Sequence, residues 1–367
     1  MKLSVKSLAA HQKFEDHETI LFSSFHDIDP IDILSEYPKV IEIHPTDVCN
    51  QACQYCFHGG KGFGKNSVTI RKQNPISDWG PHLFTQMKKV GIQNLSISGG
   101  GEPLMYSGID DLIFSAKENG LNVRLVTHGN FADPNIHTSL KICDNIRISL
   151  DTMNANTYLE MRGVKQESGL MDETIKNISK LVKIRNNQDS YPHVGVSCVV
   201  TNKNINEMST FIPFILEELN ADTLILKSDI YSQNKNEVLQ LINIIDKFKL
   251  TFGDQLLFRS DVPNGLTLAT KCFSSIWKVA FDPLGKLYSC CLGAQPGDPN
   301  GYELGQFKLG EDFDLFWRHT KAKREDISKG PISCSSCNYT DKLLNYQIIE
   351  LIEKEKNEQL NKQYTNS

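Results

Sequence analysis

The sequence lacks three features that would place the protein at a membrane or on a nucleic acid. It has no run of about 18 apolar residues, so no segment suits a transmembrane helix. Its first residues, MKLSVKSLAAHQKFEDHETI, have no apolar stretch of the kind that a secretion signal needs. It also has no basic surplus, because 39 Lys and Arg face 44 Asp and Glu, a net charge of −5. We therefore expect a cytoplasmic protein with neither a nucleic-acid nor a membrane partner.

The sequence is not short of cysteine. A chain of 367 residues is long enough for one large domain and a small one, and it needs no disulfide or metal merely to fold. Ten cysteines in a reducing compartment are therefore unsuited to disulfides. Their spacing indicates metal or redox chemistry.

Strand-like and helix-like segments alternate from about residue 40 onward. Helical periodicity is clear at 172–186 and 204–220. Six short β-branched runs suit buried parallel strands. These runs are 40–45, 94–99, 122–129, 145–151, 193–200 and 222–229. The alternation predicts an α/β fold with a parallel sheet, open or curled into a partial barrel.

Polar and cysteine-rich motifs follow the ends of the predicted strands. Cys49 follows the first strand, GGGEP (99–103) the second, THGN (127–130) the third and Asp151 the fourth. In parallel α/β folds, chemistry is located at the carboxyl ends of the strands. This edge of the sheet is therefore the predicted active site.

The sequence changes character after about residue 255. Residues 277–291 predict a hairpin around 283–285, a helical pattern follows at 314–326, and CSSC occupies 334–337. We divide the chain into four parts. These are an N-terminal extension (1–38), a barrel domain (39–255), a C-terminal module (256–345), and a terminal helix with a frayed tail (346–367).

The first cysteine cluster is Cys49, Cys53 and Cys56. A structural zinc ion usually takes four ligands, and His44 or His58 could supply the fourth. Spacing alone leaves zinc open.

Two motifs together resemble the radical S-adenosylmethionine (SAM) superfamily. The first is C-x3-C-x2-C with Tyr55 before the third cysteine, and the second is SGGGEP about 50 residues later. The resemblance implies a partial (β/α)6 TIM-like barrel in which three thiolates hold a [4Fe–4S] cluster. The fourth iron would chelate SAM, and one electron would cleave SAM to a 5′-deoxyadenosyl radical that abstracts hydrogen from the substrate.

The same resemblance implies further SAM contacts. Gly100, Gly101 and Glu102 match the motif that receives the ammonium group, whereas Ser149 and Arg162 match positions that bind the carboxylate. Tyr55 and Phe57 would lie near the adenine. Where the family often has Thr-Asn-Gly, this chain has His128 as the middle residue, and we expect His128 to face SAM or the substrate.

A second cluster resembles the auxiliary iron–sulfur module of radical SAM enzymes. The spacing C-x12-G-x4-C is followed by C-x2-C, and four cysteines suit the one-cluster Twitch version better than the two-cluster SPASM version. They are Cys272, Cys290, Cys334 and Cys337. A four-thiolate zinc site would look the same and stays open. Cys143 and Cys198 are predicted core residues.

A closed auxiliary cluster implies a substrate radical that loses a second electron. The nearest pattern is the Twitch-domain dehydrogenase of the butirosin pathway, which oxidises an amino-cyclitol alcohol. We therefore expect oxidation of a small sugar- or cyclitol-type alcohol, with an external reductant of the flavodoxin or ferredoxin type. Candidate bases at late strand ends are Lys227, Asp229 and Arg259.

Two alternatives remain. A peptide-modifying maturase or epimerase is one, although the 38 residues before the first strand are too few for a packed peptide-recognition domain. An epimerase would also need a cysteine hydrogen donor such as Cys198 or Cys291. The other alternative is a zinc-stabilised binding protein without catalysis.

Overall fold

The computed structural model describes most of the chain between residues 33 and 354. The described residues are 33–56, 58, 76–130, 138–164, 169–187, 192–228, 235–260, 271–294, 302–329, 337, 342, 345–346, 348–350 and 352–354. Residues 1–32 of the expected N-terminal extension and residues 355–367 of the expected tail lie outside them.

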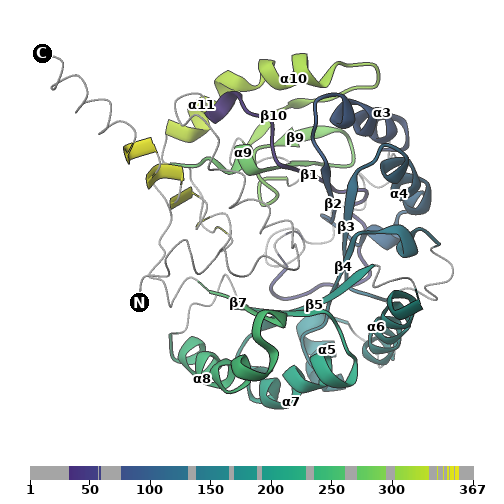
Figure 1. Cartoon of the computed structure of the whole chain (residues 1–367), viewed down its shortest axis with the longest axis vertical. Coiled ribbons are helices and arrows are strands. Elements are labelled where there is room, and N and C mark those ends of the chain that lie inside the picture. The colour runs from purple at the N-terminus through teal and green to yellow at the C-terminus, as the bar shows by residue number, and fades with distance from the viewer. Residues whose placement is uncertain are drawn as a thin grey trace, which may run out of the picture.

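A single curved sheet of ten strands organises the described part of the chain (Figure 1). Its order is β10-β9-β8-β1-β2-β3-β4-β5-β6-β7, and the pairing is parallel from β8 through β1 to β7. The strands are β1 (Val40–Ile43), β2 (Asn94–Ile97), β3 (Asn122–Thr127), β4 (Asn145–Ser149), β5 (His193–Val200), β6 (Thr223–Ser228), β7 (Leu256–Arg259), β8 (Lys278–Phe281), β9 (Lys286–Tyr288) and β10 (Glu303–Gln306).

Helices cover the convex side of this sheet (Figure 1). The α-helices are α3 (Ile76–Lys89), α4 (Ile109–Glu118), α5 (Ala155–Arg162), α6 (Leu170–Asn187), α7 (Met208–Pro213), α8 (Lys235–Phe252), α9 (Ser274–Trp277), α10 (Phe313–His319) and α11 (Lys321–Lys329). The short helical turns are η2 (Ile33–Ser35), η4 (Pro103–Met105), η5 (Thr138–Ile142), η6 (Ile205–Glu207), η7 (Phe214–Glu218) and η8 (Gly253–Gln255). No helix among the described residues is long and apolar enough to cross a membrane.

The main core lies between the sheet and these helices. Alternate strand residues such as Ile41, Leu95 and Val123 are fully or almost fully buried against helical residues such as Leu83 and Leu112. Because successive strand side chains point to opposite faces, the intervening residues face the concave side. That set is much more polar and includes Glu42, Ser96 and Arg124. The apolar core thus lies between the sheet and the helices, whereas the concave side of the sheet carries polar side chains that can bind a ligand.

The α/β fold expected from the sequence is confirmed, and it is consistent with a partial TIM-like barrel. The six expected strands are β1 to β6, and the expected hairpin is β8 and β9, with Gly285 at φ +82° in the turn. β7 and β8 were not among the six. They extend the parallel sheet at both edges, so the sheet continues past residue 255, where the sequence suggests the barrel domain ends.

A buried ion pair joins the C-terminal hairpin to the barrel. Lys278 of β8 places its Nζ 3.3 Å from the Glu42 carboxylate of β1, and His44 Nε2 lies 3.0 Å from the same carboxylate. Burial alone would raise the pKa of Glu42, but the Lys278 charge and the His44 contacts outweigh it and lower that pKa well below its usual range. This interaction joins β8 to β1 electrostatically.

Candidate active site

The loop that carries the first three cysteines runs from the end of β1, at residue 44, to Cys56. Its first half is bound to the loop that follows β2: the Gly101 N–H donates to the Thr46 carbonyl (2.9 Å) and the Glu102 N–H donates to the Val48 carbonyl (2.8 Å). A Cβ on Gly101 would lie 2.2 Å from the Val48 carbonyl oxygen, closer than any real contact. Glycine is therefore required at 101 by the backbone of the cysteine loop.

The second half of the cysteine loop is bound to the end of α5. The Ala52 N–H donates to the Arg162 carbonyl (2.9 Å) and the Gln54 N–H donates to the Met161 carbonyl (3.0 Å). Gly163 caps this helix in the left-handed region at φ +61°, and a Cβ there would lie 2.2 Å from the Ala52 carbonyl oxygen. The cysteine loop is thus anchored on both sides through backbone contacts.

The three thiols of this loop lie within electrostatic range of one another. The Cys49 side chain is accessible to solvent, yet surrounding protein atoms desolvate its thiol and, together with repulsion from Glu102, Cys53 and Cys56, raise its pKa to about 12. Burial also raises the pKa of Cys53. Within the described ranges, no three His, Cys, Asp or Glu side chains converge as a ligand set for one metal ion. Three neighbouring thiols are nevertheless a donor set that suits an iron–sulfur cluster, whose binding would release their protons.

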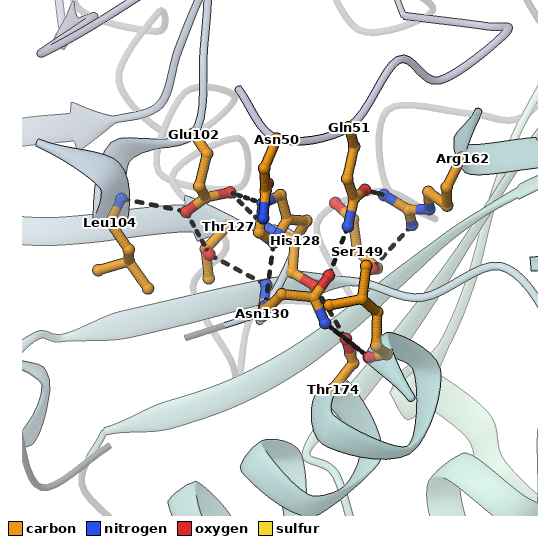
Figure 2. A network of polar contacts seen from close by, with 12 residues as sticks. Asn50, Gln51, Glu102, Leu104, Thr127, His128, Asn130, Ser149, Arg162 and Thr174 are labelled. Carbon is orange, nitrogen blue, oxygen red and sulfur yellow. Dashed lines mark hydrogen bonds and ion pairs between the residues drawn. The ribbon is translucent and has the colours of Figure 1, made fainter. Parts of the chain in front are cut away.

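Glu102 lies at one end of the polar network in Figure 2. Its side chain is buried and accepts hydrogen bonds from the Leu104 N–H (3.1 Å), the Thr127 hydroxyl (2.6 Å) and the His128 N–H (2.8 Å). An ionised carboxylate has about four acceptor positions, so one more donor can be accommodated. This geometry fits the expected contact of Glu102 with an ammonium group, which stays a prediction.

His128 connects the end of β3 to the cysteine loop. Its Nδ1 accepts from the Asn130 N–H (2.9 Å), so the ring proton of the neutral form is on Nε2, which donates to the Asn50 side chain (2.7 Å). Burial lowers the pKa of His128, which favours this neutral form. In the structure the same Nε2 also lies 3.5 Å from the Glu102 carboxylate, so His128 links Glu102 to the residue that follows Cys49. That His128 faces SAM or the substrate stays a prediction.

Arg162 is buried beneath the cysteine loop. It pairs with Asp151 (2.5 Å) and donates to the Ser149 carbonyl (2.7 Å), and its Nη1 lies 3.9 Å from the Cys53 sulfur. The Tyr55 hydroxyl donates to the same Asp151 carboxylate. The Nε of Arg162 is buried and has no hydrogen-bond partner among the described residues, which leaves one donor for a bound anionic group such as a cofactor carboxylate.

Three amide side chains in this network were not identified from the sequence. Gln51 donates to Asn130 (2.5 Å), whose own amide nitrogen donates to the Leu170 carbonyl (2.6 Å), and Asn50 accepts from His128. Figure 2 shows them between Glu102 and Arg162. Asn50 and Gln51 occupy spacer positions of the C-x3-C motif, and two adjacent amides there are the only local signal.

The predicted bases lie farther along the sheet. Lys227 is the second-last residue of β6 and Arg259 the last residue of β7; they are register partners, five and six strands from β1. Asp229 lies outside the described residues, as does Phe57. A role in proton transfer for any of them stays a prediction.

The second cysteine set is described in part. Cys272 lies 3.1 Å from the Ser274 hydroxyl, which donates to the Ser289 carbonyl (3.1 Å) and so places Cys272 near the chain segment of Cys290. The Asn345 amide also donates to the Cys272 sulfur (3.9 Å). Cys337 is described and Cys334 is outside the described residues. An auxiliary cluster here stays a prediction.

Comparison with known proteins shows what parts of this chain are similar to. Residues 43–208 match the model of the Radical SAM superfamily. Mycofactocin maturase MftC of Mycolicibacterium smegmatis is 22% identical over 315 residues, which are 81% of this chain and 74% of that protein. An S-adenosylmethionine-dependent nucleotide dehydratase of Selenomonas ruminantium is 22% identical over 178 residues, 47% of this chain and 60% of that protein.

Two solved structures share the fold. Streptococcus suis SuiB bound to the precursor peptide SuiA has a TM-score of 0.58 at 16% identity, over 77% of this chain and 65% of SuiB. The protein anSMEcpe with bound AdoMet has a TM-score of 0.54 at 14% identity, over 86% of this chain and 97% of that one. The chain thus spans less than two thirds of SuiB and of the dehydratase. The segment 43–208 is thus similar to the radical SAM superfamily, whose enzymes use a [4Fe–4S] cluster and SAM.

Proposed function

We propose that this protein is a radical SAM maturase that modifies a peptide. The observation that carries the proposal is the similarity to mycofactocin maturase MftC, which extends over 315 residues and thus well beyond the family match at 43–208. The fold of SuiB, a protein that was crystallised with its precursor peptide, is compatible with the proposal. The sequence-based expectation of cyclitol-type alcohol oxidation stays a prediction, and these relatives favour its alternative.

In this proposal Cys49, Cys53 and Cys56 hold the cluster that binds SAM. When bound, cluster and SAM supply the one-electron chemistry that starts hydrogen abstraction from the substrate. Glu102, with three of its acceptor positions occupied by protein donors, offers the fourth to the SAM ammonium group.

Arg162 has two tasks in the same proposal. Its buried Nε offers a charged hydrogen bond to the SAM carboxylate, while the Asp151 carboxylate keeps the buried guanidinium neutralised as a pair. Its Nη1 near the Cys53 sulfur adds a hydrogen bond to a cluster ligand, which is one of the factors that set a cluster's reduction potential. Tyr55, through Asp151, holds this pair in place.

We assign the four C-terminal cysteines to an auxiliary cluster that accepts an electron. A peptide crosslink, like an alcohol oxidation, removes two electrons from the substrate. One hydrogen atom leaves to the SAM-derived radical, and a proton and one electron leave in the second step. A closed four-cysteine site suits the second electron transfer.

The test is a comparison of substrate classes with the anaerobically reconstituted full-length protein, SAM and a reductant. Short peptides encoded beside the gene should stimulate 5′-deoxyadenosine release and lose about 2 mass units or gain a crosslink by mass spectrometry. A Cys49→Ala variant, treated identically, should do neither. Turnover of amino-cyclitol alcohols or nucleotides, with every peptide unchanged, would overturn the peptide assignment.

A further inference from the structure

The orientation of the Asn130 side chain is fixed by a backbone carbonyl. Its amide nitrogen donates to the Leu170 carbonyl (2.6 Å) and to the Thr174 hydroxyl (2.8 Å). A carbonyl oxygen only accepts hydrogen bonds, so the nitrogen of Asn130 must face Leu170 and its oxygen must face the other way. That oxygen accepts from the Gln51 amide (2.5 Å) and from the Tyr158 hydroxyl (3.1 Å). The two donors and the two acceptor positions of the Asn130 amide are thus all used.

The Gln51 side chain takes its orientation from Asn130. Its nitrogen must face the Asn130 oxygen, because two oxygens there would repel each other, and the same nitrogen donates to the Tyr158 hydroxyl (3.2 Å). The Gln51 oxygen therefore lies on the opposite side of the amide, toward Arg162 (Figure 2). A chain of hydrogen bonds that begins at the Leu170 carbonyl thus determines which end of the Gln51 amide faces the cysteines.

The Gln51 oxygen lies beside both Arg162 and the Cys53 sulfur. It accepts from Arg162 Nη1 (3.4 Å) and lies 3.7 Å from the Cys53 sulfur. The same Nη1 lies 3.9 Å from that sulfur, so the Gln51 oxygen and the sulfur compete for one donor. Because Arg162 is buried, water screens these contacts only weakly.

We propose that Gln51 is a positioning residue that keeps the reduction potential of the cluster bound at Cys53 low. A hydrogen bond donated to a cluster sulfur favours the reduced, more negatively charged form and so raises the potential. The Gln51 oxygen competes with the sulfur for Arg162 Nη1, and it places the negative end of an amide dipole beside the sulfur. Both effects favour the oxidised form. The inference rests on the cluster assignment in the proposed function, but not on the identity of the substrate.

The test is a redox titration followed by electron paramagnetic resonance. The protein is the full-length chain with Cys334→Ala and Cys337→Ala, reconstituted without oxygen and without SAM, so that the second cysteine set is incomplete. Gln51→Leu should raise the midpoint potential by an amount that corresponds to about tenfold in the reduction equilibrium, ~59 mV for one electron. Asn130→Leu should raise it too, because the released Gln51 amide can turn its nitrogen toward the Cys53 sulfur.

The matched control is Gln54→Leu in the same loop. The Gln54 side chain is exposed and accepts from Lys203 (2.9 Å) on the surface. This variant should leave the midpoint potential unchanged. All three variants should retain about four irons, because the backbone hydrogen bonds that anchor the cysteine loop remain.

The outcomes separate this inference from the proposed function. A midpoint potential that is unchanged or lower in Gln51→Leu overturns the inference, as does an equal rise in Gln54→Leu, whatever the peptide assay gives. A rise in Gln51→Leu without one in Asn130→Leu supports the effect of the Gln51 oxygen and overturns its orientation by Asn130. Absence of any cluster signal without these substitutions overturns both the inference and the cluster assignment. The expected potentials without turnover of any peptide support the inference and contradict only the peptide substrate.

Discussion

The two cysteine regions of this molecule are held in different ways. The loop from residue 44 to Cys56 is fixed by backbone hydrogen bonds to the β2 loop on one side and to the end of α5 on the other. Cys272 is held mainly through side chains, by the Ser274 hydroxyl and by Asn345, whose side chain also accepts from the Phe273 N–H (2.5 Å). The first region is therefore positioned by the barrel itself, whereas the second depends on contacts with the segment around residue 345.

This difference suggests different tasks. A ligand loop fixed by the backbone of two neighbouring elements keeps one geometry while a cofactor binds and leaves. A site held by side chains from a distant segment can be lost without loss of the barrel. We therefore expect the two regions to respond separately to substitution.

The largest expected effect comes from removing one cysteine from each region. Cys53→Ala should abolish SAM cleavage, because it removes a thiolate from a set of three. Cys337→Ala should preserve release of 5′-deoxyadenosine without substrate turnover, because the second site acts after hydrogen abstraction. Anaerobic assays of 5′-deoxyadenosine and product check both. Full turnover by Cys337→Ala would contradict the role of the second region.

A smaller effect, on the free energy of unfolding, is expected when one ion pair near the cysteine loop and one in the C-terminal strands are broken. Asp151→Ala leaves Arg162 buried and unpaired, which should lower the free energy of unfolding by about 3–5 kcal/mol. The matched pair in the C-terminal strands joins Lys286 of β9 to Glu303 of β10 (2.8 Å), and both side chains are about one-third exposed. Glu303→Ala should cost no more than about 1 kcal/mol. Denaturant unfolding measures both, and equal costs would contradict the distinction.

Two glycines with similar backbone conformations test the anchoring of the cysteine loop. Gly163 and Gly91 both have positive φ, +61° and +82°, so alanine strains either by about 1 kcal/mol. A Cβ at Gly91 meets nothing within 4 Å, whereas one at Gly163 meets the Ala52 carbonyl at 2.2 Å. Gly163→Ala should therefore also lower the iron content after reconstitution, by about half or more. Equal iron content in the two variants would show that this contact does not position the loop.

The smallest expected effect concerns the pH dependence of stability. The pKa of Glu42 is lower in the folded protein than the value of 4.5 that it has when unfolded. Glu42 therefore contributes stability that is fully present above about pH 4.5 and is lost as the pH falls toward its folded pKa. Glu42→Gln should flatten the acid limb of the unfolding free energy between about pH 3 and 5. An unchanged slope would contradict the ion pair with Lys278.

Much of the fold could be predicted because its strands have a local signature. The runs at 40–45 and 193–200 are β-branched and apolar, and they form β1 and β5. β7 escaped prediction because Leu256–Arg259 is short, has no β-branched residue and directly follows a helix. Its identity depends on pairing with β6, which is a tertiary property.

The candidate site was predictable in its motifs but not in its contacts. The three cysteines and Glu102 follow from spacing in the sequence. The pairing of Arg162 with Asp151 and the link from His128 to Asn50 join residues on separate elements, and no local pattern encodes them. Arg162 was expected to contact the carboxylate of SAM. In the structure Asp151, which follows β4, also supplies a carboxylate to Arg162 at the end of α5, and the sequence alone does not place these two residues together.

The most direct test of the central claim is an electron paramagnetic resonance measurement on a variant that keeps only the first cysteine region. Cys334→Ala/Cys337→Ala, reconstituted without oxygen and reduced, should contain about four irons, and SAM should change its spectrum because one iron has no protein ligand. Loss of all iron, or a spectrum that SAM leaves unchanged, would contradict the assignment of Cys49, Cys53 and Cys56.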